Sequence, residues 1–155
     1  MTTLESTEKI RRINMNRVAP EVYKAVLALN EAAAKDLDED LAELIKIRAS
    51  QMNSCAFCVD MHTKDARKRG IGEQKLALLP AWEEAGDIYT EQEQAALALT
   101  EEMTDLTHRH VSDEVYARAA AAFSEKELAQ VIAMALTINA WNRIGVTTRL
   151  QPPRR

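Results

Sequence analysis

The chain has 155 residues, of which 46% are apolar, 28% are charged and 5% are aromatic, and its formal net charge is −4. This length and composition suit a single domain, residues 1–155, whose hydrophobic core needs no disulfide to hold it together. The modest charge and scattered basic residues exclude nucleic acid as an expected partner, and no run of 18 apolar residues predicts a membrane span. Two cysteines and a polar stretch over residues 1–16 favour a cytoplasmic protein.

Apolar residues recur at helical spacing through most of the chain, and only four glycines and four prolines interrupt them. We therefore expect an all-α fold of about six to eight helices. Pro20 opens the first helix, and residues 36–39 offer capping chemistry for the second. The helices predicted in the first half of the chain are 20–35, 38–52 and 55–68.

The second half of the chain contains two capping-box patterns, TxxE at residues 90–93 and SxxE at residues 124–127. Each pattern opens an apolar-periodic stretch, and a shorter helix, 113–123, is predicted between them. The last helix extends from residue 125 to about residue 143 or beyond. Its apolar surface is wide enough to be buried on more than one side, which predicts a central helix or a contact with another subunit.

The two cysteines, Cys55 and Cys58, form a CxxC motif at the start of a predicted helix, with His62 four residues after the second. Cysteines at this spacing can form a disulfide after modest adjustment, and the positive end of the helix favours a thiolate. His62 is placed to take up the thiol proton of Cys58, and Glu43 on the preceding helix to orient the imidazole or accept its proton. The pattern predicts a redox site with a nucleophile, a base and a group that tunes the base.

Other interpretations of the same residues stay open. The two cysteines could bind zinc with His62 and Glu43, although a single CxxC motif seldom makes a closed structural site, or they could be inert buried side chains. His62 alone could be a structural histidine, and Glu43 a surface carboxylate. The histidines at 108 and 110 are more typical of a solvated loop than of a metal site. We expect neither a metal ion nor an organic cofactor.

Residues 38–72, with Glu43, the CxxC motif and His62 at these spacings, resemble the core motif of the alkylhydroperoxidase D-like (AhpD-like) proteins of the carboxymuconolactone decarboxylase superfamily. The resemblance implies a helical homo-oligomer, whether dimer, trimer or hexamer. It also implies that Cys58 attacks a peroxide, that Cys55 resolves the sulfenic acid into a disulfide, and that His62 and Glu43 relay protons. Phe57 stands where many of the peroxidases have a second histidine, which removes one proton carrier.

The same resemblance implies the partners of the reaction. They are a hydroperoxide substrate, a lipoyl-bearing or thioredoxin-like thiol donor, and a peroxiredoxin that the protein could itself reduce. We therefore expect an antioxidant thiol peroxidase or disulfide oxidoreductase. Two other functions stay open: a redox-sensing or structural helical oligomer, and an enzyme or binding protein of the same fold with an unknown small-molecule substrate.

Overall fold

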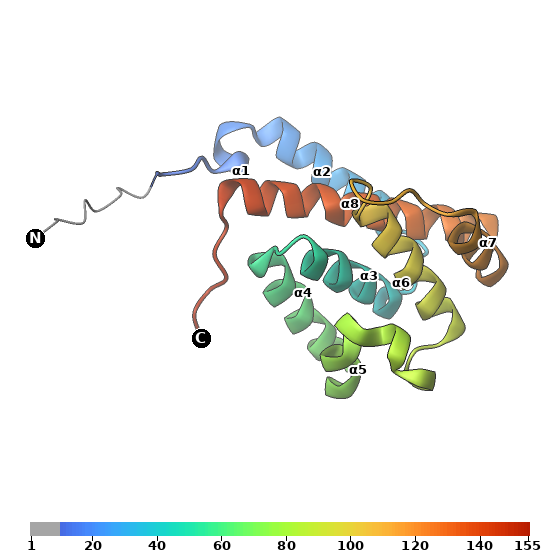
Figure 1. The fold of residues 1–155 in the computed structure, drawn as a ribbon. Coiled ribbons are helices and arrows are strands. Elements are labelled where there is room, and N and C mark those ends of the chain that lie inside the picture. Colours follow the sequence, from blue (N-terminus) through green and yellow to red (C-terminus); the bar gives the residue numbers. More distant parts are fainter. Residues whose placement is uncertain (1–9) are drawn as a thin grey trace, which may run out of the picture.

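The computed structural model describes residues 10–155, and within that range all regular structure is helical (Figure 1). No helix in this range is long and apolar enough to cross a membrane. The predicted all-α fold is confirmed, with eight α-helices and two 3-10 segments among residues 10–155. The elements are α1 (Met15–Val18), α2 (Pro20–Ala34), α3 (Glu39–Met52), α4 (Ala56–Arg69), α5 (Glu73–Leu78), η1 (Leu79–Glu84), η2 (Gly86–Ile88), α6 (Glu91–Thr104), α7 (Asp113–Ala122) and α8 (Glu125–Thr148).

Local capping chemistry sets most of the helix ends. The side chain of Asp38 accepts a hydrogen bond from the backbone N–H of Leu41 at 2.8 Å, and both predicted capping boxes are formed, at Thr90 and Ser124. Gly70 ends α4 with a φ of 93°, a conformation that side-chain-bearing residues rarely adopt. Helices α2, α3, α4 and α7 therefore begin and end within one residue of their predicted bounds.

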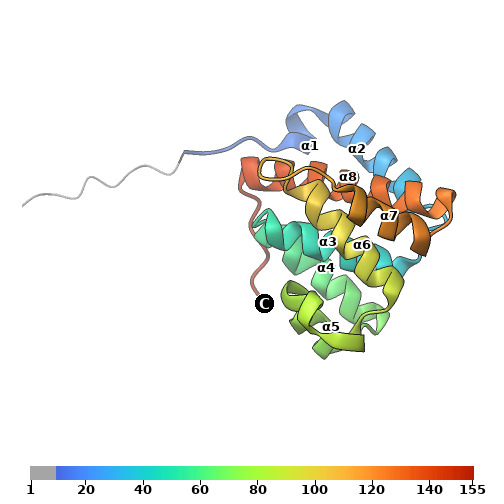
Figure 2. The ribbon, with the colours of Figure 1, turned by 45° about the vertical axis from the view of Figure 1, so that its right-hand side comes forward.

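Two hydrophobic clusters hold the helices together, and α3 belongs to both. Its Leu41 and Ile45 join the larger cluster with residues of α2, α6, α7 and α8, while Leu44 and Ile47 join the smaller one with residues of α4, α5, η1 and α6. In both views α8 lies between α2 on one side and α3 on the other (Figures 1 and 2). The last helix is thus the central helix that its wide apolar surface predicts.

A chain of hydrogen-bonded amides, of which Asn142 is buried, joins the turn between α3 and α4 to α8. The Asn53 side-chain amide donates to Oδ1 of Asn139 at 3.0 Å and to Oδ1 of Asn142 at 2.9 Å. Asn142 in turn donates to Oγ of Ser50 at 2.9 Å, and it is only 1% exposed. Because buried amides without partners are costly, these bonds fix the turn that leads into the CxxC motif against α8.

Replacing Asn142 with alanine tests this connection. The Asn142→Ala variant removes a partner of the buried Ser50 and one of the two partners of the half-buried Asn53, so the free energy of unfolding should fall by about 2–4 kcal/mol. Val146→Ala, at a half-exposed position of the same helix, is the matched control and should change it by no more than about 0.5 kcal/mol. Urea unfolding of both variants measures the two effects, and equal effects would contradict the role given to the amides.

Candidate redox active site

Cys55 and Cys58 form a disulfide at the N-terminus of α4, with 5.3 Å between their Cα atoms. Cys55 itself caps the helix, and its Sγ accepts a hydrogen bond from the backbone N–H of Cys58 at 3.4 Å. Ser54 adopts a left-handed conformation, with φ of 54°, and turns the chain into the helix. The two cysteines are only 2% and 3% exposed, so both sulfurs lie beneath the surface.

Helix α8 passes directly over the disulfide at Gly145. A Cβ atom at this position would lie 2.9 Å from Sγ of Cys55 and 3.4 Å from Sγ of Cys58. Only a residue without a side chain lets the helix approach so closely. Gly145 was not among the predicted site residues, although a glycine inside a helix costs about 1 kcal/mol relative to alanine and is therefore a sign of a packing constraint.

Glu43 on α3 lies between two nitrogen groups and is only 8% exposed. Its Oε2 is 3.2 Å from Nδ1 of His62, and its Oε1 accepts a hydrogen bond from Nζ of Lys46 at 2.8 Å. Burial raises the pKa of Glu43, but the hydrogen bonds from His62 and Lys46 outweigh it and hold the pKa below its ordinary value of 4.5. Glu43 is therefore an ionised, buried carboxylate, which makes Nδ1 of His62 the donor and leaves Nε2 available for proton transfer.

Cys58 and His62 line one cavity of about 290 Å³. Among residues 10–155 the imidazole is hydrogen-bonded to Glu43, and it forms no hydrogen bond with either sulfur of the disulfide. The structure therefore brings the four predicted site residues together as two pairs, a disulfide and a carboxylate–imidazole pair. One member of each pair faces the shared cavity, so the oxidised site presents a sulfur and a base to the same space.

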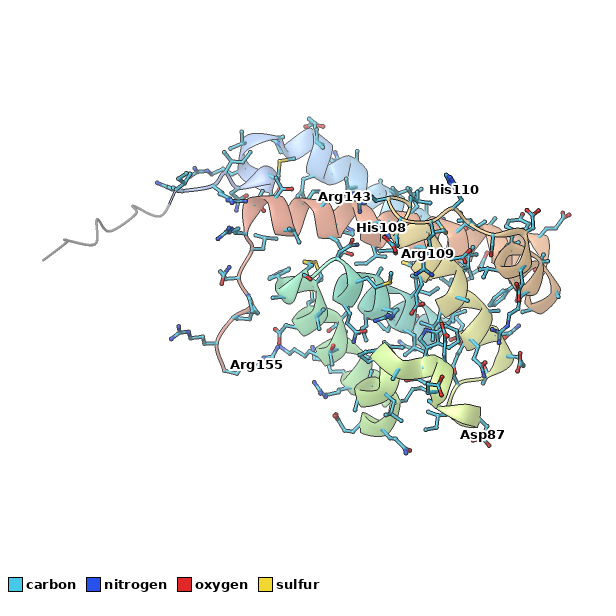
Figure 3. The ribbon with its side chains drawn as sticks, in the orientation of Figure 1. Asp87, His108, Arg109, His110, Arg143 and Arg155 are labelled. Atoms are coloured by element: carbon cyan, nitrogen blue, oxygen red, sulfur yellow. A yellow bond between two sulfur atoms is a disulfide. The ribbon has the colours of Figure 1, made fainter. Side chains whose placement is uncertain are left out.

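Cys55 faces a second, more polar cavity of about 200 Å³, which Ser54 and the residues after α8 also line. Leu150 lines both this cavity and the one beside Cys58. The chain then continues alongside α4 to Arg155, whose guanidinium donates to Asp60 at 2.7 Å (Figure 3). These contacts hold the C-terminal segment 149–155 across the start of α4.

His108 and His110 lie on the loop between α6 and α7 (Figure 3). Both are exposed, and Nδ1 of His108 is 2.6 Å from Oδ1 of Asp105. This is the solvated loop that the sequence predicted. Within residues 10–155, no three His, Cys, Asp or Glu side chains are grouped in a way that could hold a metal ion.

Known proteins resemble this chain in sequence and in fold. Residues 20–102 match the sequence model of the carboxymuconolactone decarboxylase family. The chain is 40% identical over 137 residues to the uncharacterized protein YdfG of Bacillus subtilis strain 168, covering 88% of this chain and 92% of YdfG. A crystal structure from Agrobacterium tumefaciens, of a protein of unknown function named as a candidate antioxidant defence protein AhpD, is 39% identical with a TM-score of 0.89, over 94% of this chain and all of that one.

A more distant neighbour shares the fold alone. The debrominase Bmp8 is 20% identical, with a TM-score of 0.76 over 86% of this chain and 72% of its own. The same helical fold therefore occurs in a protein named for antioxidant defence and in one named for debromination. The fold does not by itself determine the reaction.

The contact between Gly145 and the disulfide predicts that Gly145→Ala destabilises the native chain but stabilises a chain that lacks the sulfur of Cys55. In the otherwise native chain, Gly145→Ala should lower the free energy of unfolding by up to about 2 kcal/mol, because overpacking outweighs the gain in helix propensity. In the Cys55→Ala background the nearer sulfur is gone, so the same substitution should stabilise by about 0.5–1 kcal/mol. Urea unfolding of the four proteins measures both effects, and an equal loss in the two backgrounds would contradict the contact.

The lowered pKa of Glu43 predicts a pH-dependent contribution to stability. Near pH 7, Glu43→Gln should lower the free energy of unfolding by about 1.5–3 kcal/mol, because charge-assisted hydrogen bonds are lost. Since the folded-state pKa lies below 4.5, this contribution is present above that value and disappears as the pH falls through the folded pKa. Urea titrations of both proteins at decreasing pH measure the difference, with the exposed Glu83→Gln as control; a difference that persists in strong acid would rule out the assignment.

Proposed function

The chain belongs to the carboxymuconolactone decarboxylase family, of which it is an AhpD-like member, and we propose that it is a thiol peroxidase that also acts as a disulfide oxidoreductase. The observation that carries this proposal is the Cys55–Cys58 disulfide at the start of α4, with the Glu43–His62 pair beside it. A nucleophile, a base and a resolving thiol are the groups that peroxide reduction by a dithiol needs.

Cys58 is the proposed nucleophile because it shares a cavity with His62 and lies in the first turn of α4. The positive helix end favours its thiolate, and Nε2 of His62 takes up the thiol proton. The thiolate attacks the terminal oxygen of the hydroperoxide and the O–O bond breaks. Cys58 becomes a sulfenic acid, and the departing alkoxide receives the proton from His62 and leaves as an alcohol.

Cys55 is the proposed resolving thiol. It attacks the sulfur of the sulfenic acid, the S–O bond breaks, and the hydroxide combines with the Cys55 proton to leave as water. The distance of 5.3 Å between the two Cα atoms supports this step, because a disulfide spans that separation without movement of the backbone. Glu43 is a positioning residue in this scheme, since it acts on the imidazole rather than on the substrate.

A dithiol donor, lipoyl-bearing or thioredoxin-like, completes the proposed cycle. One donor thiolate attacks Cys55 through the second cavity, Cys58 departs as the thiolate, and the second donor thiol releases the donor as a disulfide. The sum is one hydroperoxide and one dithiol converted into one alcohol, one water and one disulfide. A peroxiredoxin as an alternative electron acceptor, and a cytoplasmic location, remain predictions.

Assembly into a homo-oligomer, whether dimer, trimer or hexamer, is also part of the proposal. It is supported by apolar side chains that are more than half exposed on the outer faces of the helices, namely Val18, Val22 and Leu136. Such side chains lose their contact with water when a second chain packs against them, which favours assembly.

Redox sensing is the second candidate function, and the burial of both sulfurs favours it. A disulfide whose cysteines are only 2–3% exposed exchanges slowly with a macromolecular donor, because the rate of exchange depends on access to the sulfur. Slow exchange suits a switch that changes stoichiometrically. Turnover separates the two functions, because a sensor consumes one equivalent of peroxide and then stops.

Steady-state consumption of cumene hydroperoxide, with dihydrolipoamide as reductant, tests the proposed peroxidase. Cys58→Ser should abolish turnover. Cys55→Ser should also stop the cycle but leave a sulfenic acid on Cys58 that dimedone traps. His62→Ala should lower kcat by about 10²–10⁴-fold because the proton carrier is lost. His108→Ala, which removes an exposed histidine that is also paired with a carboxylate, is the matched control and should keep native turnover.

Two results would overturn the proposal. Undiminished turnover in Cys58→Ser would show that the disulfide is not the reacting group. Oxidation of one equivalent of dithiol by peroxide, without further consumption in the presence of the donor, would favour the redox-sensing function instead.

A further inference from the structure

Two segments of the chain, 10–19 and 139–155, are rich in arginine. The first contains three arginines and the second contains four, and neither contains an aspartate or a glutamate. In both views the stretch before α1 lies at the same end of the molecule as the last turns of α8 (Figures 1 and 2). This end is therefore basic, although the whole chain has a formal net charge of −4.

A hydrogen bond joins the two arginine-rich segments. Nη1 of Arg12 donates to the backbone carbonyl of Thr147 at 2.7 Å. Arg11, Arg12 and Arg143 line a groove of about 560 Å³ between the stretch before α1 and α8. Ile13 lines the same groove and is 57% exposed. The groove thus presents guanidinium groups together with apolar area, a composition that favours contact with another protein.

The same end of α8 reaches the cavity beside Cys55. Arg149 lines that cavity with Ser54. Val146 also lines the cavity, and the next residue, Thr147, lines the groove; both are exposed. The groove and the cavity are therefore parts of one surface around the end of α8. We call it the arginine surface, and its arginines are Arg11, Arg12, Arg143 and Arg149.

The charges of the arginine surface are not neutralised by carboxylates of the described chain. Within residues 10–155 none of its four arginines forms an ion pair, and all four are exposed. Arg12 and Arg143 donate to uncharged oxygens instead. Asp60, which follows the CxxC motif, is itself paired with Arg155 at 2.7 Å. The surface therefore attracts anionic groups.

The position of the cavity indicates which partner meets this surface. The proposed thiol donor attacks Cys55 through the cavity that Arg149 lines. A standard protein interface buries about 800 Å² on each partner, so a protein donor that places a thiol there also covers the groove. Nucleic acids and membranes are anionic as well, but they carry no thiol and would make no use of the continuity between the arginines and Cys55.

We propose that the arginine surface is the docking site of the reducing partner, and that this partner is a protein whose dithiol lies among acidic side chains. Its carboxylates face the arginines while one donor thiolate attacks Sγ of Cys55. The Cys55–Cys58 bond breaks and Cys58 leaves as the thiolate. The second donor thiol then breaks the mixed disulfide, so the donor is oxidised as Cys55 is released. This inference rests on the proposed function and adds the charge of the donor and its docking site.

Two synthetic peptides test the charge of the donor. Each carries one dihydrolipoyl-lysine, flanked by glutamates in one peptide and by glutamines in the other. The measured quantity is the rate constant for a single reduction of the preformed disulfide, obtained by acid quenching and titration of the freed thiols. At about 20 mM salt the glutamate peptide should react at least about tenfold faster, and this advantage should disappear near about 0.5 M salt, where charges are screened.

Paired variants test the surface itself. In Arg11→Gln/Arg149→Gln two charges of the surface are lost, and neither side chain forms a hydrogen bond or an ion pair among residues 10–155. The advantage of the glutamate peptide should fall to less than about threefold. Arg109→Gln/Arg118→Gln removes the same charge at exposed positions that line neither the groove nor the cavity, and should keep the full advantage.

Binding without reduction separates the docking site from the proposed function. The glutamate peptide with its lipoyl group oxidised cannot reduce the disulfide, and its fluorescence anisotropy should report binding. Arg11→Gln/Arg149→Gln should weaken this binding about tenfold, whereas Arg109→Gln/Arg118→Gln should not.

Each outcome bears on one of the two proposals. Equal rates for the two peptides at low salt would overturn the acidic donor and leave the proposed function in place. Failure of every dithiol, dihydrolipoamide included, to reduce the disulfide would overturn the proposed function, while binding that depends on Arg11 and Arg149 would still support docking of an acidic protein. Tighter binding of a short DNA duplex, or of phosphatidylglycerol vesicles, at the same arginines would overturn the assignment to a protein.

Discussion

The approach of α8 to the Cys55–Cys58 disulfide at Gly145 is the constraint on which the rest of the site depends. With no side chain at this position, the backbone of α8 lies directly against both sulfurs. Asn142, one turn earlier on the same helix, holds the preceding turn through Asn53. The helix therefore fixes the start of α4 from two points, which buries the disulfide and gives each sulfur a different cavity to face.

The second constraint is the buried charge of Glu43. Burying a carboxylate to 8% exposure without partners would cost several kcal/mol of folding free energy. Lys46 and His62 supply those partners from α3 and α4, and together they lower the pKa of Glu43 despite its burial. The same pairing fixes the tautomer of the imidazole and pairs the ammonium group of Lys46 with the carboxylate. One electrostatic arrangement thus stabilises the buried carboxylate and orients the base.

Most of the helical framework could be predicted because its signals are local. Capping boxes at 90–93 and 124–127 and the glycine stop at Gly70 depend on neighbouring residues, and the predicted ends follow them closely. The proximity of the four site residues could be predicted for a similar reason, because residues 43–62 form a short stretch that folds as two adjacent helices. The short elements α1, α5, η1 and η2 were not predicted, because a few residues do not establish an apolar period. The cavity walls from Tyr23 and Trp141, and the cover from 149–155, depend on segments distant in sequence that only tertiary packing brings together.

The two sides of the disulfide differ in a way that fits the two halves of the proposed cycle. Cys58 faces a mostly apolar cavity, and Cys55 faces a more polar cavity that the start of the C-terminal segment helps to line. A macromolecular dithiol donor is too large for the first route, so in this scheme it displaces the segment held by Arg155 and Asp60. Leu150 lines both cavities, and displacement of the segment therefore also removes part of the apolar wall beside Cys58. Donor binding would then open the cavity for release of the alcohol, so that reduction of the disulfide and departure of the product are coupled through one segment of the chain.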